Sequence, residues 1–184
     1  MESKIKVLMF GWEFPPISSG GLGTACYGLT KGLSRKNVDI TLVLPEYPND
    51  IKSDFIKILP ASKIKIKKIN SIIMPYMTSQ SYSEKMKNKA NLRIYGSSLF
   101  EEVNRYAEAA KKIAMEETFD IIHCHDWMAF KAGINAKIIK NKPLVVHVHA
   151  TEFDRTGGNG INECVYNIEK EGLHFADKII AVSN

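Results

Sequence analysis

Residues 5–44 read IKVLMFGWEFPPISSGGLGTACYGLTKGLSRKNVDITLVL, and this stretch decides the fold class. The run at 5–10 is short and apolar and is bounded by Gly11 and a Pro-Pro pair, which is typical of a buried strand. From residue 22 to about 35, apolar side chains recur at three and four positions, which predicts a helix that stops near Asn37. The apolar run at 38–44 predicts a second strand. These segments form one β-α-β unit, whose crossover should be right-handed.

The same alternation of strand and helix resumes after residue 98. The pattern predicts helices at 99–116, 129–139 and 162–175 and strands at 120–125, 143–149 and 178–182. Residues 46–98 are less regular and are interpreted as an insertion, within which 63–67 and 69–76 predict short strands. The fold class is therefore α/β, a Rossmann-like, doubly wound and mainly parallel sheet covered by helices on both faces.

Length and composition indicate one globular domain over residues 1–184, with 45% apolar and 24% charged residues. The net charge of +5 suits an anionic ligand and equally suits a solvated, lysine-rich surface. The sequence contains no block of basic residues with interleaved aromatic residues, the pattern that would indicate nucleic-acid binding. The three cysteines have no CxxC spacing, which favours a reduced, cytoplasmic protein. No apolar stretch reaches about 18 residues, so no membrane span is predicted.

Three segments carry candidate chemistry, and the first is Gly20-Gly21-Leu22-Gly23. Glycines let a ligand approach the backbone, and free N–H groups at a helix start favour an anion. The segment is therefore a candidate loop for the phosphates of a donor, although tight packing alone would also require glycine. It matches neither GxGxxG nor the P-loop pattern.

The second segment is His123-Cys124-His125-Asp126-Trp127, at the end of a predicted strand. Alternation places His123 and His125 on one face and Cys124 on the other. His123 is expected in the core. We expect Asp126 and Trp127 to emerge into the loop, where a carboxylate can bind hydroxyl groups and an indole can stack on a sugar.

The third segment begins with His147-Val148-His149, at the end of the next strand. His149 is the last residue before the loop and can reach a cleft, whereas His147 is expected to be buried. Two His-x-His pairs also permit a metal site, as in metal-dependent hydrolases. Such a site needs further ligands, and the remaining His174 falls on a predicted helix, so no metal is expected.

Taken together, the motifs resemble a known family of enzymes. The run Phe10 to Pro16 with the glycine segment, the His-x-His-Asp-Trp segment, and the later runs Thr151 to Arg155, Ile168 to Gly172 and Ala176 to Ser183 are similar to retaining glycosyltransferases of the glycogen/starch synthase group. The resemblance covers nearly the whole chain except residues 46–98.

The resemblance implies the N-terminal half of a GT-B fold, in which two Rossmann-like domains face each other across a cleft. It implies that ADP-glucose or UDP-glucose is the donor, that a glucan or another sugar is the acceptor, and that no cofactor is needed. The C-terminal nucleotide-binding domain would be absent from this chain, which alone would be inactive. By the same resemblance His149 and Asp126 are catalytic, Gly20, Gly21, Leu22 and Gly23 lie at the donor phosphates, and Trp127 and Glu152 contact the sugar or acceptor.

Three positions depart from typical bacterial glycogen synthases. Ser18 stands where they carry lysine, Thr24 where they carry aspartate, and Ala150 where they carry asparagine. These differences favour the broader class of retaining glycosyltransferases over a strict glycogen synthase. A metal-dependent hydrolase and a non-catalytic carbohydrate-binding module remain as alternatives.

Overall fold

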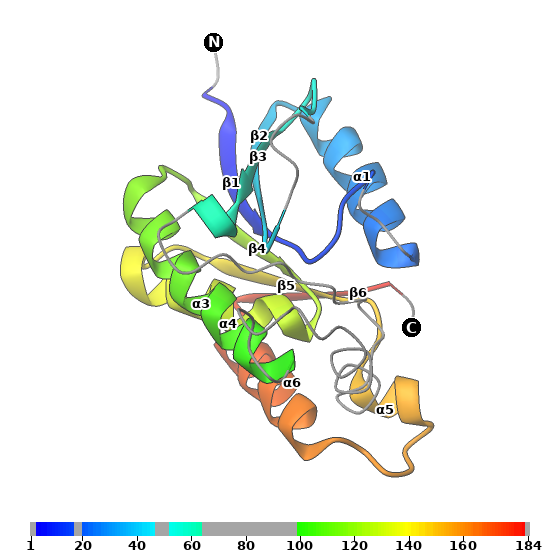
Figure 1. The fold of residues 1–184 in the computed structure, drawn as a ribbon. Helices are drawn as coiled ribbons and strands as arrows, with labels where there is room; N and C mark the ends of the chain where they lie inside the picture. Colours follow the sequence, from blue (N-terminus) through cyan, green and yellow to red (C-terminus); the bar gives the residue numbers. More distant parts are fainter. Residues whose placement is uncertain (1–2, 17–19, 47–51, 64–98, 183–184) are drawn as a thin grey trace, which may run out of the picture.

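The computed structural model describes residues 3–16, 20–46, 52–63 and 99–182 (Figure 1). Its centre is one six-stranded parallel sheet in the order β3-β2-β1-β4-β5-β6. The strands are β1 Ile5–Phe10, β2 Val38–Leu44, β3 Lys57–Pro60, β4 Ile121–His125, β5 Leu144–Val148 and β6 Lys178–Ala181. The helices are α1 Gly21–Ser34, the 3₁₀ helix η1 Ala61–Lys63, α3 Leu99–Glu116, α4 Trp127–Lys140, α5 Glu152–Thr156 and α6 Glu163–Phe175. The predicted α/β Rossmann-like class is confirmed.

Helices cover the two faces of the sheet unequally. On one face α3, α4 and α6 bury a large apolar cluster that includes Cys124, Leu144 and Val146 (Figure 1). On the other face α1 lies over a smaller cluster that contains Leu22, Cys26 and strand residues of β1 and β2. Because a strand alternates its side chains, neighbouring residues of β4 and β5 enter these two different environments.

Two glycines allow the larger cluster to close. A Cβ added at Gly133 of α4 would meet the Cys124 Sγ and would lie 2.8 Å from Leu144 Cδ1. A Cβ at Gly172 of α6 would lie 2.6 Å from Cγ of Phe130. Contacts this short are repulsive, so each helix can approach its neighbour only where a side chain is missing.

The structure corrects several boundaries. Residues 57–60 lie within the span interpreted as an insertion, yet they form β3, an edge strand of the central sheet. Helix α4 begins at Trp127 rather than 129, and the short α5 was not predicted. Of the strands predicted at 63–67 and 69–76, only Lys63 is described, as the last residue of η1; the rest lie outside the described residues.

All six strands run in the same direction, so their carboxyl ends meet at one edge of the sheet. At this edge β1 is followed by the segment leading to α1, β4 is followed by Asp126, and β5 by His149. The three segments that carry candidate chemistry therefore share one edge, as the sequence predicts.

Candidate functional site

Asp126 joins the ends of two neighbouring strands. Its carboxylate Oδ1 accepts a hydrogen bond of 2.7 Å from the backbone N–H of His149. Its own backbone N–H donates to the His147 carbonyl at 3.0 Å, and its carbonyl accepts from Ala129 N at 3.0 Å in the first turn of α4. Asp126 thus holds the loop after β5 against the start of α4. Asp126 is buried, with 3% of its surface exposed, so these hydrogen bonds lie inside the protein.

The backbone of Asp126 has φ 59° and ψ 169°. This region is almost restricted to glycine, and a non-glycine residue there costs about 1–3 kcal/mol. The surrounding hydrogen bonds hold the residue in this conformation. Burial raises the pKa of the Asp126 carboxyl to about 6, although the N–H groups of His149 and Ala150 and the charge of Arg155 act in the opposite direction.

His149 lies where the sequence predicts, directly after β5 and half-buried. Its Nε2 is 3.1 Å from Nδ1 of His125, so one of the two rings donates a hydrogen bond to the other. Burial lowers the pKa of His149. A neutral imidazole held at one nitrogen by a neighbouring ring is well placed to present its other nitrogen to a ligand.

The histidines of the two His-x-His pairs gather on one face of the sheet. The register pairs His125 directly with His147. The rings of His123 and His125 have centroids 4.5 Å apart, and those of His147 and His149 are also 4.5 Å apart. The sequence treats the two pairs as separate, whereas the structure unites them. Each pair therefore has a candidate further ligand in the other pair, which the expectation of no metal did not take into account.

The histidines of this group are held in the neutral form. Burial, and to a smaller extent the neighbouring His147 and His149, lower the pKa of His123 to about 4. Burial and then His149 lower the pKa of His147 to about 4. His125 is completely buried, and its pKa lies well below the usual value, chiefly because of that burial. The sequence expectation that His123 is a core residue is confirmed, while His147 is only half-buried.

Helix α1 starts at this edge. Gly20 is its N-cap and makes no side-chain capping bond, and the first turn holds no acidic residue. The predicted loop therefore is mostly helix, since Gly21, Leu22 and Gly23 already belong to α1. The Leu22 side chain is fully buried in the apolar cluster under α1, so Leu22 could approach donor phosphates only through its backbone.

The buried thiol of Cys26 in α1 is influenced by the charges of two carboxylates, Asp126 and Glu13. Burial raises the pKa of Cys26 in α1 to about 12, and the charges of Asp126 and then Glu13 add to the shift. Glu13 follows β1 and is itself buried.

The structure buries both residues that were predicted to contact the sugar or acceptor, Trp127 and Glu152. Trp127 is the first residue of α4 and is 3% exposed, packed in the larger apolar cluster and against Phe100. An indole that stacks on a sugar needs an exposed ring face, which Trp127 does not offer. Glu152 is also buried, and both its oxygens are used within the protein: Oε1 accepts from Asn162 N at 2.9 Å and Oε2 from Arg155 Nη2 at 3.2 Å.

The segment after β5 is built as a support for the edge. Thr151 caps α5, and its side chain and that of Asp154 form a reciprocal capping box. Arg155 Nη2 forms an ion pair with Glu169 Oε1 of α6 at 2.7 Å, and its Nη1 donates to the Ala150 carbonyl at 2.6 Å. The run Thr151 to Arg155 therefore fixes the loop that carries His149.

Comparison with known proteins gives the family. A family model described as the starch synthase catalytic domain matches residues 6–184. The chain belongs to this family. It is 29% identical to an uncharacterized glycosyltransferase of Methanocaldococcus jannaschii, over 97% of this chain and 40% of that protein. It is 22% identical to the glycogen synthase of Mycobacterium tuberculosis, over 97% of this chain and 42% of that protein.

Solved structures show the same fold. The sucrose-phosphate synthase of Thermosynechococcus elongatus matches with a TM-score of 0.65 at 15% identity, covering 96% of this chain and 42% of that one. The catalytic domain of starch synthase IV from Arabidopsis thaliana, bound to ADP and acarbose, matches with a TM-score of 0.60 at 17% identity, covering 96% and 42%. The fold is that of GT-B glycosyltransferases. The comparisons support neither the hydrolase nor the separate binding module.

The chain spans about two fifths of the length of the curated relatives it matches. In the part of the chain that the structure describes, no helix combines the length and the apolar character that crossing a membrane requires.

Proposed function

We propose that this chain forms the N-terminal half of a retaining glycosyltransferase that moves glucose, or a similar hexose, from ADP-glucose or UDP-glucose to a glucan or another sugar acceptor. The observation that carries the proposal is the contact between Asp126 and His149 at the carboxyl edge of the sheet. It lies in a chain of the starch synthase family, at the edge where open parallel sheets bind ligands.

The transfer requires help for two charges. As the bond between sugar and diphosphate breaks, negative charge grows on the phosphate and positive charge on the sugar ring. The N–H groups at the start of α1, behind Gly20 and Gly21, suit the phosphate because a helix N-terminus carries partial positive charge. We assign to His149 the positioning of the transferred sugar. No further cofactor is part of this proposal for the transfer step.

Asp126 acts as a positioning residue in this scheme. It is buried, and its Oδ1 holds the backbone of His149, so its effect on the substrate passes through His149. The strained backbone of Asp126 fits this role, because strain of this kind is kept where a site must be held in one geometry.

A second Rossmann-like domain is part of the proposal, as the other wall of the cleft. Each exposed N–H contact to a phosphate contributes only about 0.5–1.5 kcal/mol, and even millimolar affinity needs roughly 4 kcal/mol. Residues 1–184 alone should therefore bind a nucleotide sugar weakly and transfer nothing, whereas a longer chain that includes the second domain should do both. We also assign the enzyme to the cytoplasm as part of this proposal.

The deciding experiment uses the longer chain with ADP-glucose or UDP-glucose and a glucan. The variant His149→Ala should lower kcat by a factor on the order of 10²–10³, the usual cost of losing one well-placed polar group. The matched control is His174→Ala, because His174 is exposed on α6 and should leave kcat unchanged. Unchanged kcat in folded His149→Ala, or absence of transfer by the unaltered longer chain, would overturn the proposal.

A further inference from the structure

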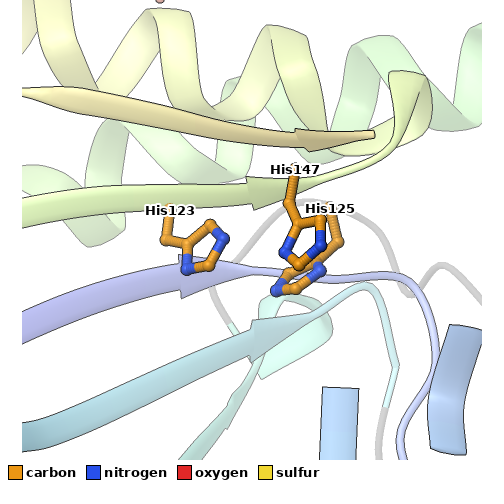
Figure 2. A group of neighbouring side chains, drawn as sticks. All are labelled: His123, His125 and His147. Atoms are coloured by element: carbon orange, nitrogen blue, oxygen red, sulfur yellow. The ribbon is translucent and has the colours of Figure 1, made fainter. Parts of the chain in front are cut away.

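Three imidazoles from two strands converge on the face of the sheet that α1 partly covers. His123 and His125 come from β4 and His147 from β5, and Figure 2 shows the three rings lying together. One ring nitrogen from each residue lies within 4.8 Å of the others. The register pairs His125 with His147, so the HCH run at 123–125 and the HVH run that begins at His147 place three imidazoles side by side on one face.

Each residue of this cluster carries a buried nitrogen without a hydrogen-bond partner among the described residues. These atoms are Nε2 of His123, Nε2 of His125 and Nδ1 of His147. His125 is completely buried and His123 is 7% exposed, so neither ring turns toward bulk solvent. A buried polar atom without a partner is costly, and most such atoms in folded proteins are paired. Three in one place therefore indicate a ligand that all three bind.

We propose that His123, His125 and His147 bind a divalent transition-metal ion of the zinc class. Three imidazole nitrogens are the donor set that Zn²⁺, Cu²⁺ and Ni²⁺ accept, whereas Mg²⁺ and Ca²⁺ require oxygen. Ligand nitrogens around a tetrahedral zinc lie about 3.4 Å apart, from Zn–N distances of about 2.0–2.1 Å. Binding would therefore shorten the separations of up to 4.8 Å between the ring nitrogens.

The cluster is prepared for a cation in two further ways. Imidazole binds a metal in its neutral form, and the burial of His123 and His125 favours that form. His147 is only half-buried, so part of its side chain is accessible to solvent.

The proposed ion also has a consequence for His149. If His125 binds the ion through Nε2, its proton must lie on Nδ1, which then donates to His149 Nε2 at 3.1 Å. His149 would then carry its own proton on Nδ1. The ion would thus fix the tautomers of both rings, in the same way that outer partners orient metal ligands in other proteins.

The test uses the chain of residues 1–184 without a histidine tag, freed of metal by dialysis against a chelator, and titrated with Co²⁺ and then Zn²⁺. We expect one equivalent of Co²⁺ to bind, with visible absorption bands that Zn²⁺ abolishes, and Zn²⁺ to raise the Tm. His147→Ala should weaken Zn²⁺ binding by at least the roughly 10–100-fold that loss of an outer partner costs. No donor or acceptor sugar is present, so the result is independent of the transferase assay.

His174→Ala is the matched control, since it removes one histidine on α6 outside the cluster and should leave Co²⁺ binding unchanged. His147→Gln serves as a second variant in case His147→Ala does not fold, as judged by circular dichroism. The proposal is overturned if the unaltered chain binds no Co²⁺ saturably up to millimolar concentration. Equal Zn²⁺ affinity of the folded His147 variants and the unaltered chain would also overturn it.

Discussion

The two faces of β4 and β5 differ sharply although they belong to the same ten residues. On one face Cys124, Leu144 and Val146 are fully buried under α4 and its neighbours. On the other face the alternating positions are Ile121, Val145 and three histidines, and each histidine carries a buried nitrogen without a partner among the described residues. The apolar face is tightly packed, because the missing side chain of Gly133 leaves room for Cys124 and Leu144 and for nothing larger.

The difference separates two sources of constraint. Apolar packing explains every residue of the first face, and a change of volume there should cost stability. It does not explain the second face, where leucine or valine would bury as much area without leaving polar atoms unsatisfied. We therefore expect the histidines of this face to serve ligand binding, at a cost in stability from their unsatisfied buried nitrogens.

The largest effect should appear on acidification. In metal-free protein the depressed histidine pKa values mean that the unfolded chain takes up protons first as the pH falls. Stability should therefore be lost between pH 6.5 and about 4. At about 1.4 kcal/mol per pKa unit, His123 alone accounts for about 3 kcal/mol, and His125 and His147 act in the same direction.

Asp126 opposes this loss over part of the same range. Its pKa is raised from 3.8 to about 6, so the folded state takes up its proton first, and acidification through pH 6 stabilises the fold through this group. The histidines outnumber it, and the net change should be destabilising. Urea unfolding at pH 7, 6, 5 and 4 measures the profile. A stability that stays constant or rises from pH 6.5 to 4 would contradict neutral, buried histidines.

On the apolar face, Leu144→Ala should destabilise the chain by about 2–5 kcal/mol, the usual range for removing a fully buried leucine. Its side chain lies against the position of Gly133, which cannot fill the space left behind. Urea unfolding at pH 8 measures the change, with Ile138→Ala as an exposed control on α4. A loss below 1 kcal/mol would mean that this face can repack and is not tightly packed.

Much of the fold could be predicted from the sequence because most elements have strong periodic patterns. The strand at 5–10 and the helix starting at 99 combine an apolar pattern with clear boundaries, and both were located correctly. The strand β3 was missed because four residues at a sheet edge, ending in Pro60, are too short to show a period. The helix α5 was missed because its five residues are too few to show an apolar repeat. The capping pair Thr151 and Asp154 was the sequence signal for its start.

The sequence predicted where the candidate site residues lie but not how deeply they are buried. Strand ends in a parallel sheet share an edge, so the sequence placed Asp126 and His149 together correctly. Burial could not be deduced for Trp127, because the same residue can begin a helix toward the core or end a loop toward solvent. The union of the two His-x-His pairs depends on the register of β4 against β5. The single helix between these strands was the available signal that they are neighbours.

The smallest effect, and the sharpest test of the contrast, is the replacement of His123 by leucine. In metal-free protein at pH 8, His123→Leu removes the unpartnered Nε2 and keeps a buried apolar side chain of similar size. Removing a buried polar atom without a partner gains about 1–3 kcal/mol, from which an imperfect fit subtracts up to about 1.5 kcal/mol, so stability should stay equal or rise by about 1 kcal/mol.

Urea unfolding with and without Zn²⁺ measures the stability of His123→Leu and of the unaltered chain. With Zn²⁺ at a hundred times its Kd, the unaltered chain should gain about 2.7 kcal/mol and become the more stable of the two. If His123→Leu instead costs as much as Leu144→Ala without metal, then His123 is held by ordinary packing, and the two faces of the sheet do not differ in kind.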